Sequence, residues 1–383
     1  MSLFLLLFFL LYGGVHLYFY SKLKTAFVLS AFSSTVLAIF LFLMVVAPLL
    51  VRLAEREGLE ATGRALAIAG YTWMGFIFLF SSLAITLDLY HALLPLAGKL
   101  FHFNGPAYFM SSRGSFLIAC GWGILVSLYG VYEAQNIRAE RVEIRTAKLS
   151  AGMDKLTIVQ ISDVHLGLMV RHGRVSRIIE LIEKADPDIV VSTGDLVDGQ
   201  LDGVTDLAQY FRNIRPRFGK YAVTGNHEFY AGLNSSLLLT REAEFRVLRN
   251  ESVEVGERVL LVGVDDPAAT RGGATAVGVS EQLLLERSPR ERFVILLKHR
   301  PVIDRNSLGK FDLQLSGHVH KGQIFPFNLL TYLFYPIKTG LSQFPQQTSL
   351  YVSRGTGTWG PPIRFLAPPE VTVIELIPAP ADK

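Results

Sequence analysis

The chain has 383 residues, and half of them are hydrophobic, which exceeds the share usual in a soluble domain. Its net charge is only +4, and its lysines and arginines form no basic block, so no nucleic-acid-binding footprint stands out. Cys120 is the only cysteine, which excludes an internal disulfide and a thiolate metal cluster.

The excess of hydrophobic residues lies within the first 135 residues. A helix needs roughly 20 apolar residues to cross a hydrocarbon core of about 30 Å. The first apolar segment lacks the basic start and the cleavage site of a signal peptide, so we interpret it as a span. We therefore predict a transmembrane domain of four helices over residues 1–135, with spans at 3–20, 26–51, 65–93 and 115–132.

Positive charge near the span ends predicts the orientation. An even number of spans places both chain ends on one side, and seven basic residues lie on that side against four on the other. Under the positive-inside rule this favours a cytoplasmic C-terminal half, anchored in a bacterial inner membrane or a plasma membrane. The seven are Arg52, Arg56, Arg64, Arg138, Arg141, Arg145 and Lys148; the four are Lys22, Lys24, Lys99 and Arg113.

Four ionisable residues, His16, Asp88, Tyr90 and His91, fall in or beside these spans. An ionisable group at membrane depth is a candidate for function. These groups lie near predicted span ends, and we interpret them as interfacial residues.

From residue 155 onward, short apolar runs alternate with helical patterns. The runs at 156–161, 189–192, 221–223, 260–264, 293–297 and 313–315 are typical of buried strands, and helical spacing predicts helices at 175–184 and 205–212. Strands alternating with helices predict a layered α/β domain at 155–383, joined to the spans by a linker and first strand at 136–154.

Polar residues follow five of these strands. In such sheets, the loops after the strand carboxyl ends converge on one crevice. A lone histidine after a strand is usually not a ligand, but five of the nine histidines stand at these exits. Imidazole nitrogens mixed with carboxylate and amide oxygens suit Zn, Mn or Fe, whereas Ca and Mg prefer oxygen ligands. The exits read Ser162-Asp163-Val164-His165, Gly194-Asp195-Leu196-Val197-Asp198, Gly225-Asn226-His227-Glu228, Lys298-His299-Arg300 and Gly317-His318-Val319-His320.

A pair of divalent ions accounts for this mixture of ligands. Ions about 3.5–4 Å apart repel each other, and a shared carboxylate holds them at that spacing. The pair lowers the pKa of a bridging water and clamps the attacking and phosphoryl oxygens. The sequence therefore predicts hydrolysis of a phosphate ester or anhydride by a metal-bridging hydroxide.

The ordered set Asp-x-His, Gly-Asp-x-x-Asp, Gly-Asn-His-Glu, a lone His and Gly-His-x-His is similar to the signature of the calcineurin-like metallophosphoesterases, over residues 156–323. The resemblance implies a four-layer β-sandwich flanked by helices. It also implies that His227 and Asp195 are catalytic, with His227 acting on the phosphoryl group or leaving oxygen. The metal ligands it implies are Asp163, His165 and His320 for the first ion, Asn226, His299 and His318 for the second, and Asp195 for both.

The motif Gly-His-x-His-x-Gly-Gln followed by an apolar insertion resembles a membrane-associated branch of this superfamily. That branch includes phosphodiesterases and lipid A pathway pyrophosphatases acting on a nucleotide-linked diacyl sugar. It often has glycine where this chain has Lys321. This lysine either contacts a substrate phosphate or points to solvent. Arg300 and Arg364 are further candidates, because guanidinium groups bind phosphate with two hydrogen bonds.

Several features keep two interpretations open. The apolar stretch at 323–335 is either a core helix or a surface that rests on the bilayer. The glycine-rich loop at 355–360 either borders the cleft or is a structural turn. Asp198 and Glu228 either hydrogen-bond the ligating histidines or lie in solvated loops.

The leading functional prediction is a membrane-anchored phosphoesterase with two divalent ions that hydrolyses a phosphodiester or pyrophosphate in a lipid-linked or nucleotide-linked substrate. A protein phosphatase would use the same metal chemistry. A binding scaffold of this fold would have lost metal ligands, and this chain retains the full set. A transporter or sensor would need polar pathways through the spans, and the spans contain few polar groups. We expect membrane lipid as a partner and no nucleic acid.

Overall fold

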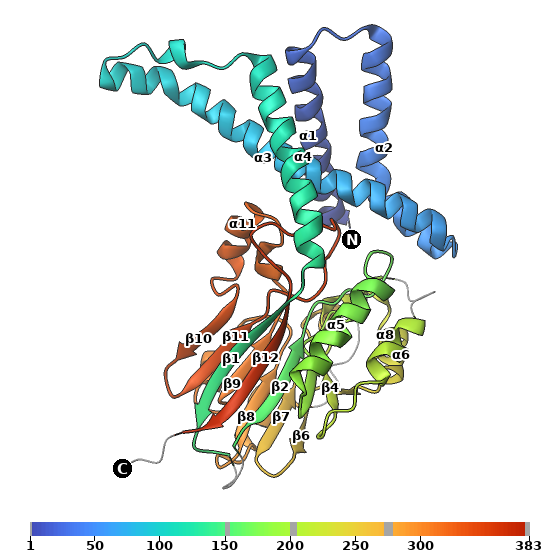
Figure 1. The fold of residues 1–383 in the computed structure, drawn as a ribbon, viewed down its shortest axis with the longest axis vertical. Coiled ribbons are helices and arrows are strands. Elements are labelled where there is room, and N and C mark those ends of the chain that lie inside the picture. The colour runs from blue at the N-terminus through green and yellow to red at the C-terminus, as the bar shows by residue number, and fades with distance from the viewer. Residues whose placement is uncertain (1, 150–153, 200–204, 272–278, 380–383) are drawn as a thin grey trace. The chain divides into compact units, whose positions relative to one another are not determined.

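The computed structural model describes residues 2–149, 154–199, 205–271 and 279–379 (Figure 1). It divides into two compact units. One comprises Met1–Tyr132 with Gly360–Ile363, and the other comprises Glu133–Trp359 with Arg364–Lys383.

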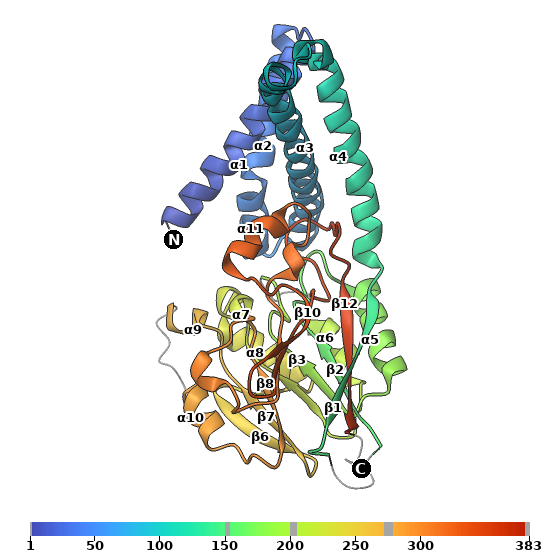
Figure 2. The same cartoon turned by 90° about the vertical axis from the view of Figure 1, so that its left-hand side faces the viewer.

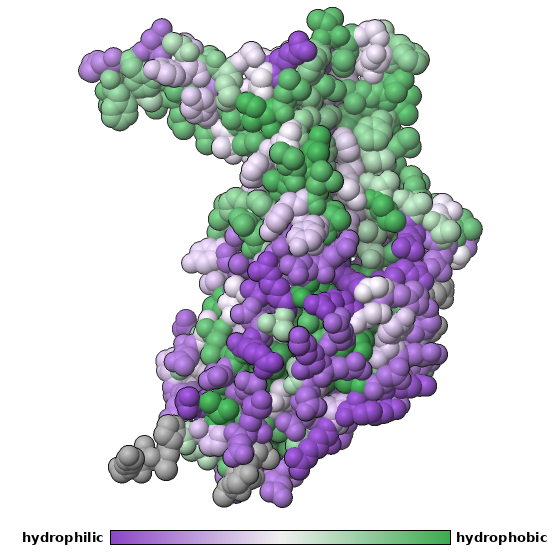
Figure 3. All heavy atoms as spheres, in the orientation of Figure 1, coloured by the Kyte–Doolittle hydropathy of each residue, from purple (hydrophilic) through white to green (hydrophobic). Residues whose placement is uncertain are grey.

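The first unit is built from long apolar helices, namely α1 (Ser2–Ala26), α2 (Ala31–Arg56), α3 (Glu60–Phe101) and α4 (Ser112–Gln135). Each is long and apolar enough to cross a membrane, as predicted. Helices α1, α3 and α4 extend past their predicted spans at both ends, whereas α2 begins five residues later than predicted and ends five residues later. The surface of these helices is mainly hydrophobic, whereas the visible face of the second unit is mainly hydrophilic (Figure 3). With 42 residues, α3 is about 63 Å long, roughly twice the thickness of a hydrocarbon core.

Polar side chains join α1 to α3 at two levels. His16 is buried, and its Nε2 atom accepts a hydrogen bond of 2.9 Å from the Trp73 indole. Asp88 accepts a hydrogen bond of 2.7 Å from Tyr18 and forms an ion pair with Lys22. His16 thus lies in the middle of α1 and takes part in helix packing. The interpretation of His16 as an interfacial residue at a span end is wrong.

The second unit contains two six-stranded sheets. The order in the first is β1 (Arg138–Thr146), β12 (Glu370–Pro378), β2 (Leu156–Ile161), β3 (Ile189–Ser192), β4 (Lys220–Ala222) and β5 (Arg246–Val247). The order in the second is β10 (Gly340–Phe344), β11 (Thr348–Val352), β9 (Leu313–Ser316), β8 (Phe293–Leu297), β7 (Val259–Gly263) and β6 (Glu251–Val255). Strands β2 to β5 are parallel, and so are β7, β8, β9 and β11.

The two sheets and their helices form four layers (Figures 1 and 2). Successive side chains of a strand point to opposite faces, so Ile158 packs between the sheets while Val159 packs under the helices. The helices on the first sheet are α5 (His172–Ala185), α6 (Thr205–Arg212) and α8 (Leu233–Glu242), and α10 (Glu281–Glu286) lies on the second. The predicted four-layer sandwich is confirmed.

The predicted strands are also confirmed, each within one residue of its observed ends. Helix α6 has its predicted bounds, and α5 is longer than predicted at both ends. The other short elements are η1 (Gly105–Tyr108), α7 (Asn226–Ala231), α9 (Ala268–Arg271), η2 (Arg305–Ser307), η3 (His320–Gly322) and α11 (Phe327–Phe334).

Candidate metal centre

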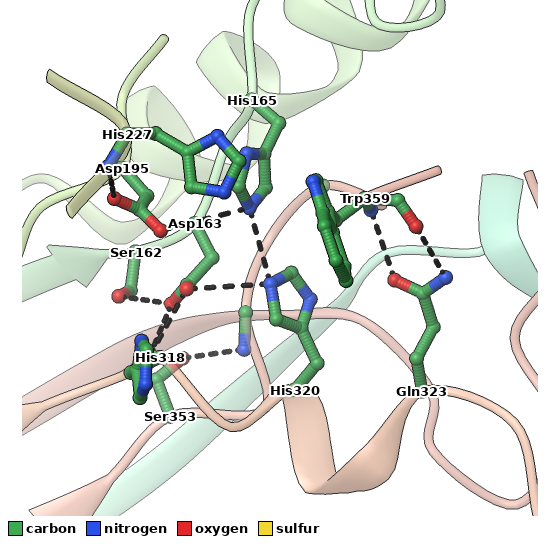
Figure 4. Close-up of polar contacts among 12 residues, drawn as sticks. Ser162, Asp163, His165, Asp195, His227, His318, His320, Gln323, Ser353 and Trp359 are labelled. Carbon is green, nitrogen blue, oxygen red and sulfur yellow. Dashed lines mark hydrogen bonds and ion pairs between the residues drawn. The ribbon is translucent and has the colours of Figure 1, made fainter. Parts of the chain in front are cut away.

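The predicted ligands converge where β2, β3, β4, β8 and β9 end. Figure 4 shows five of them, namely Asp163, His165, Asp195, His318 and His320. All of them are buried except His318, which is partly exposed. Because these strands belong to both sheets, the loops that follow them meet at one edge of the sandwich. Three groups of side chains place their ligand atoms within 4.8 Å of one another. They are Asp163, His165 and His320; His165, Asp195 and His227; and Asp195, His299 and His318.

The first group lies at the ends of β2 and β9. The His320 Nε2 atom is 3.3 Å from Asp163 Oδ1 and 3.1 Å from His165 Nε2. Three potential ligand atoms therefore face one another in a buried space. This is the set predicted for the first ion.

The group of Asp195, His299 and His318 is centred on Asp195, which follows β3. The His299 Nε2 atom is 3.2 Å from Asp195 Oδ2 and 3.1 Å from His318 Nδ1. The same Asp195 oxygen is 4.0 Å from His165 Nε2, so this carboxylate lies between the two groups, as a bridging ligand must. The buried Oδ1 atom of Asn226 has no hydrogen-bond partner among the described residues.

The titratable groups of the cluster shift one another's pKa. Burial opposes ionisation of Asp195, but His299 and His227 outweigh it and hold the carboxyl pKa well below its usual range. Burial likewise opposes the charged form of His299, and the Asp195 carboxylate nevertheless raises its pKa to about 10. Burial lowers the pKa of His318 to about 3 and that of His320 to about 4, so both imidazoles are neutral at physiological pH.

These residues fit a pair of divalent ions. The buried carboxylates require positive charge, the neutral imidazoles offer lone pairs, and Asn226 offers an unused oxygen. The Nδ1 atom of His299 lies 2.8 Å from the Thr193 carbonyl oxygen, which leaves its Nε2 atom facing Asp195. Two ions held here would activate a water and stabilise negative charge on a phosphoryl group.

His227 is oriented by Asp198. Its Nδ1 atom lies 3.1 Å from the Asp198 carboxylate and 3.0 Å from the Asp198 carbonyl oxygen. Burial disfavours the charged imidazole, but Asp195 and Asp198 outweigh burial and raise the His227 pKa to about 10. Both carboxylates therefore favour the protonated form of His227. The His227 ring belongs to one of the ligand groups, but its Nδ1 atom is engaged by Asp198. This contact leaves the Nε2 atom of His227 to donate a proton.

Asp198 also lies 3.5 Å from the Nδ1 atom of His165. One carboxylate thus contacts a predicted metal ligand and the predicted proton donor, in agreement with the first of the two interpretations of Asp198.

Glu228 has a different role from the one predicted, because it contacts backbone amides instead of imidazoles. Its carboxylate accepts hydrogen bonds from the amides of Gly225 at 2.7 Å, Asp195 at 3.0 Å and Leu196 at 2.8 Å. It therefore ties the loop after β3 to the loop after β4.

The backbone at the centre is unusual. Asp163, His165, Asp195, His318 and His320 all have positive φ, between 47° and 72°, which costs a non-glycine residue about 1–2 kcal/mol. Strain of this kind accumulates at functional sites, where the surrounding structure enforces it.

Two glycines permit close approach at the centre. A Cβ atom on Gly225 would overlap the Asp195 carboxylate, and one on Gly317 would overlap Asp163 and Ser162. The tight spacing of the ligand groups therefore requires glycine at both positions.

Arg364 does not face the site opening. It is fully buried, and it donates to the carbonyl oxygens of Arg354 at 2.7 Å and Gly357 at 3.2 Å. Another of its nitrogens lies 2.9 Å from His320 Nδ1. The predicted phosphate contact is therefore wrong for Arg364, which organises the loop at 355–360 behind the first ligand group.

The other two predicted phosphate contacts are partly exposed. Arg300 binds Asp266 with two hydrogen bonds of 2.7 and 3.0 Å, which hold its guanidinium in place. Lys321 has no hydrogen bond or ion pair among the residues that the structure describes. Whether either binds phosphate stays a prediction.

Two exposed aromatic side chains lie beside His227: Trp359, from the loop at 355–360, and Tyr230, which the sequence analysis missed. The ring of His227 lies 5.8 Å from that of Trp359 and 5.7 Å from that of Tyr230. The Gln323 side-chain amide accepts from the Trp359 amide and donates to its carbonyl, both at 2.9 Å (Figure 4). The loop at 355–360 therefore borders the centre. The glycine pattern of this loop was the feature of the sequence that could have indicated this position.

Comparison with known proteins decides the family. Residues 156–322 match the family model described as calcineurin-like phosphoesterase. An uncharacterized metallophosphoesterase of Aquifex aeolicus is 40% identical over 255 residues, which cover 66% of this chain and 97% of that protein. The chain belongs to the calcineurin-like metallophosphoesterases.

Two further relatives of this metallophosphoesterase are informative. A Danio rerio protein named transmembrane protein with metallophosphoesterase domain is 33% identical, over 73% of this chain and 67% of that protein. The uncharacterized metallophosphoesterase YkuE of Bacillus subtilis is 31% identical, over 64% of this chain and 87% of that protein.

Proposed function

We propose that this metallophosphoesterase is anchored in a membrane by α1–α4 and hydrolyses a phosphodiester or pyrophosphate bond in a lipid-linked or nucleotide-linked amphiphilic substrate. The position of Asp195 carries the proposal, because its carboxylate belongs to two ligand groups at once. We infer that the metals are two divalent ions chosen from Mn, Zn and Fe.

The protein groups have separate tasks in this reaction. Asp195 holds the two ion sites together, and its Oδ1 atom accepts a hydrogen bond of 2.8 Å from the His227 amide. This bond fixes the donor residue relative to the bridging ligand. The protonated His227 ring then stabilises charge on the phosphoryl group and gives its proton to the leaving oxygen.

Three observations support an amphiphilic substrate. Trp359 and Tyr230 offer exposed aromatic surface beside His227. Lys321 directly follows a predicted metal ligand and supplies an unpaired positive charge. The helices α1–α4 have the length and apolar character of membrane anchors, which would keep the enzyme close to lipid-linked substrates.

Metal dependence tests the reaction. Full-length protein in lipid vesicles is stripped with a chelator and assayed with bis(p-nitrophenyl) phosphate while Mn, Zn or Fe is added back. We expect activity only with metal, and background activity for Asp195→Ala at every metal concentration. Asp206→Ala, which changes an exposed aspartate outside the centre, serves as control. Full activity after chelation would refute the proposal.

The substrate class needs a separate assay. The metal-loaded enzyme is incubated with a membrane lipid extract, and mass spectrometry follows which species loses a phosphate-linked group. The same preparation is assayed with phosphoserine and phosphothreonine peptides. Faster turnover of the peptides than of any lipid-linked species would replace the proposed substrate class with that of a protein phosphatase.

A further inference from the structure

Helix α11 exposes almost all of its apolar side chains. None of its residues is buried, although six of the eight in Phe-Asn-Leu-Leu-Thr-Tyr-Leu-Phe are apolar or aromatic. Leu329, Leu333 and Phe334 are 60%, 73% and 78% exposed. The interpretation of this stretch as a core helix is therefore wrong. Water-exposed apolar groups at this density mark a surface that is covered by something else.

The apolar surface continues beyond the helix. The Phe325 amide donates to the Phe365 carbonyl at 3.1 Å, and the Phe365 amide donates to Gln323 at 3.0 Å. These bonds place the exposed side chains of Phe325 and Leu366 on neighbouring segments. The Gln323 amide likewise holds Trp359, which is also exposed, next to the same segment.

Two lysines accompany this apolar surface. The Lys338 ammonium donates to the Asn328 carbonyl at 3.1 Å and lies 4.8 Å from the centre of the Tyr332 ring, so it sits against α11. Lys321 lies two residues before Gln323 in the chain, at the start of the same segment. Within the described part of the chain, neither ammonium forms an ion pair with a carboxylate. An exposed apolar helix beside lysines that form no ion pair matches an anionic lipid interface.

We propose that α11, together with Phe325, Trp359, Leu366, Lys321 and Lys338, docks on an anionic phospholipid bilayer. We call these residues the α11 surface. The apolar side chains would enter the interface between headgroups and acyl chains, while the lysines meet headgroup phosphates. This inference rests on the proposed membrane anchoring and is independent of the proposed substrate.

Docking at the α11 surface would bring lipid headgroups close to the metal centre. The ring of Tyr335, which follows α11, lies 5.3 Å from the ring of His318. Lys321 is adjacent in sequence to His320, another predicted ligand. A bilayer that receives α11 therefore presents its phosphates near the opening of the site.

A matched pair of labelled variants tests the docking. Cys120 is replaced by serine, and a single cysteine is placed at Leu329 in α11 or at Leu238 in α8, which are 60% and 59% exposed. Each full-length variant carries an environment-sensitive fluorophore in vesicles of phosphatidylcholine and phosphatidylglycerol. We expect doxyl-labelled lipid to quench the label at Leu329→Cys about twofold and to leave the label at Leu238→Cys unchanged.

Charge is tested in the same vesicles. Removing phosphatidylglycerol should reduce the lipid quenching of the Leu329→Cys label. In vesicles that contain phosphatidylglycerol, Lys338→Gln should lower the apparent lipid affinity, measured by this quenching, by roughly fivefold. An equal response in wild-type and Lys338→Gln backgrounds would refute the role of the lysine.

Two results would overturn the docking itself. Quenching of the Leu329→Cys label by aqueous iodide, without quenching by doxyl lipid, would place α11 in water. Protection from both quenchers would mean that protein, such as a second copy of this chain, covers α11. Metal-dependent hydrolysis of bis(p-nitrophenyl) phosphate is measured on each labelled sample, so loss of docking with retained hydrolysis refutes this inference and leaves the proposed reaction standing.

Discussion

The Asp198 carboxylate lies 3.1 Å from the Nδ1 atom of His227. This contact holds the imidazole in one orientation and favours its protonated form. It therefore links a residue after β3 to a residue after β4, and together with Asp195 it raises the pKa of His227.

The Asp198→Asn variant should lose activity, most of all in alkaline solution. Asp195 and Asp198 together raise the His227 pKa to about 10, and the neutral amide removes one of these two charges. His227 then loses its proton at a lower pH, so the alkaline fall in kcat moves downward, and activity at pH 7 drops about 10–100-fold. Asp206→Asn is the control, because Asp206 pairs with His172 at 3.1 Å outside the centre. An unchanged pH profile would exclude His227 as the proton donor.

The Glu228→Gln variant should be less stable. The carboxylate accepts backbone hydrogen bonds from both the β3 and β4 loops, and an amide in its place turns a donor toward those N–H groups. We expect a loss of about 2–4 kcal/mol in the free energy of unfolding, measured by denaturant titration of full-length protein in detergent. Glu242→Gln, which changes a partly exposed glutamate at the end of α8, should change stability by less than about 0.5 kcal/mol.

The Gly225→Ala variant should bind less metal. Its new methyl group overlaps the Asp195 carboxylate, which must then move away from the bridging position. Metal analysis of the purified variant should show less than the wild-type metal content, with activity near background. The control Gly173→Ala adds a methyl group where no atom lies within 4 Å and should keep both properties. Full metal content in Gly225→Ala would contradict the proposed geometry.

Lys220 should make stability depend on pH in alkaline solution. The Lys220 ammonium is buried and donates to the Phe211 carbonyl at 2.6 Å, and burial lowers its pKa from 10.5 to about 8. Between these two values the unfolded chain binds more protons than the folded chain, so this lysine makes stability rise as pH increases from about 8 to 10.5. Lys220→Met should remove this rise. The free energy of unfolding of both proteins, measured across this range, checks the difference, and parallel curves would contradict it.

The Trp359→Ala variant should bind aryl substrates more weakly. The exposed indole lies 5.8 Å from the His227 ring and is held by Gln323, so it can contact a leaving group without reorganising. We expect KM for an aryl phosphodiester to rise about tenfold with kcat changed less than about threefold. Trp359→Phe should retain most of the affinity. A fall in kcat without a change in KM would show that Trp359 acts on His227 instead.

The sequence predicted those parts of the structure that depend on neighbouring residues. Apolar runs such as 156–161 and 293–297 are strands because every side chain in them is buried, and burial on both faces leaves an uninterrupted apolar signature. The motifs directly after the runs at 156–161, 189–192 and 313–315 place Asp163, Asp195 and His318 at strand ends. Their convergence follows once the strands lie parallel in two facing sheets.

The tertiary structure decided what depends on residues far apart in the chain. Strand β12, at the end of the chain, pairs with both β1 and β2, and the burial of Arg364 results from loops that meet around it. Asp198 contacts His165 and His227 only because two loops close on each other. The exposure of α11 is equally nonlocal, since an apolar octapeptide has the same composition inside a core and outside one. Local patterns record the preference of a segment, whereas burial and contact depend on which distant segments the folded chain brings against it.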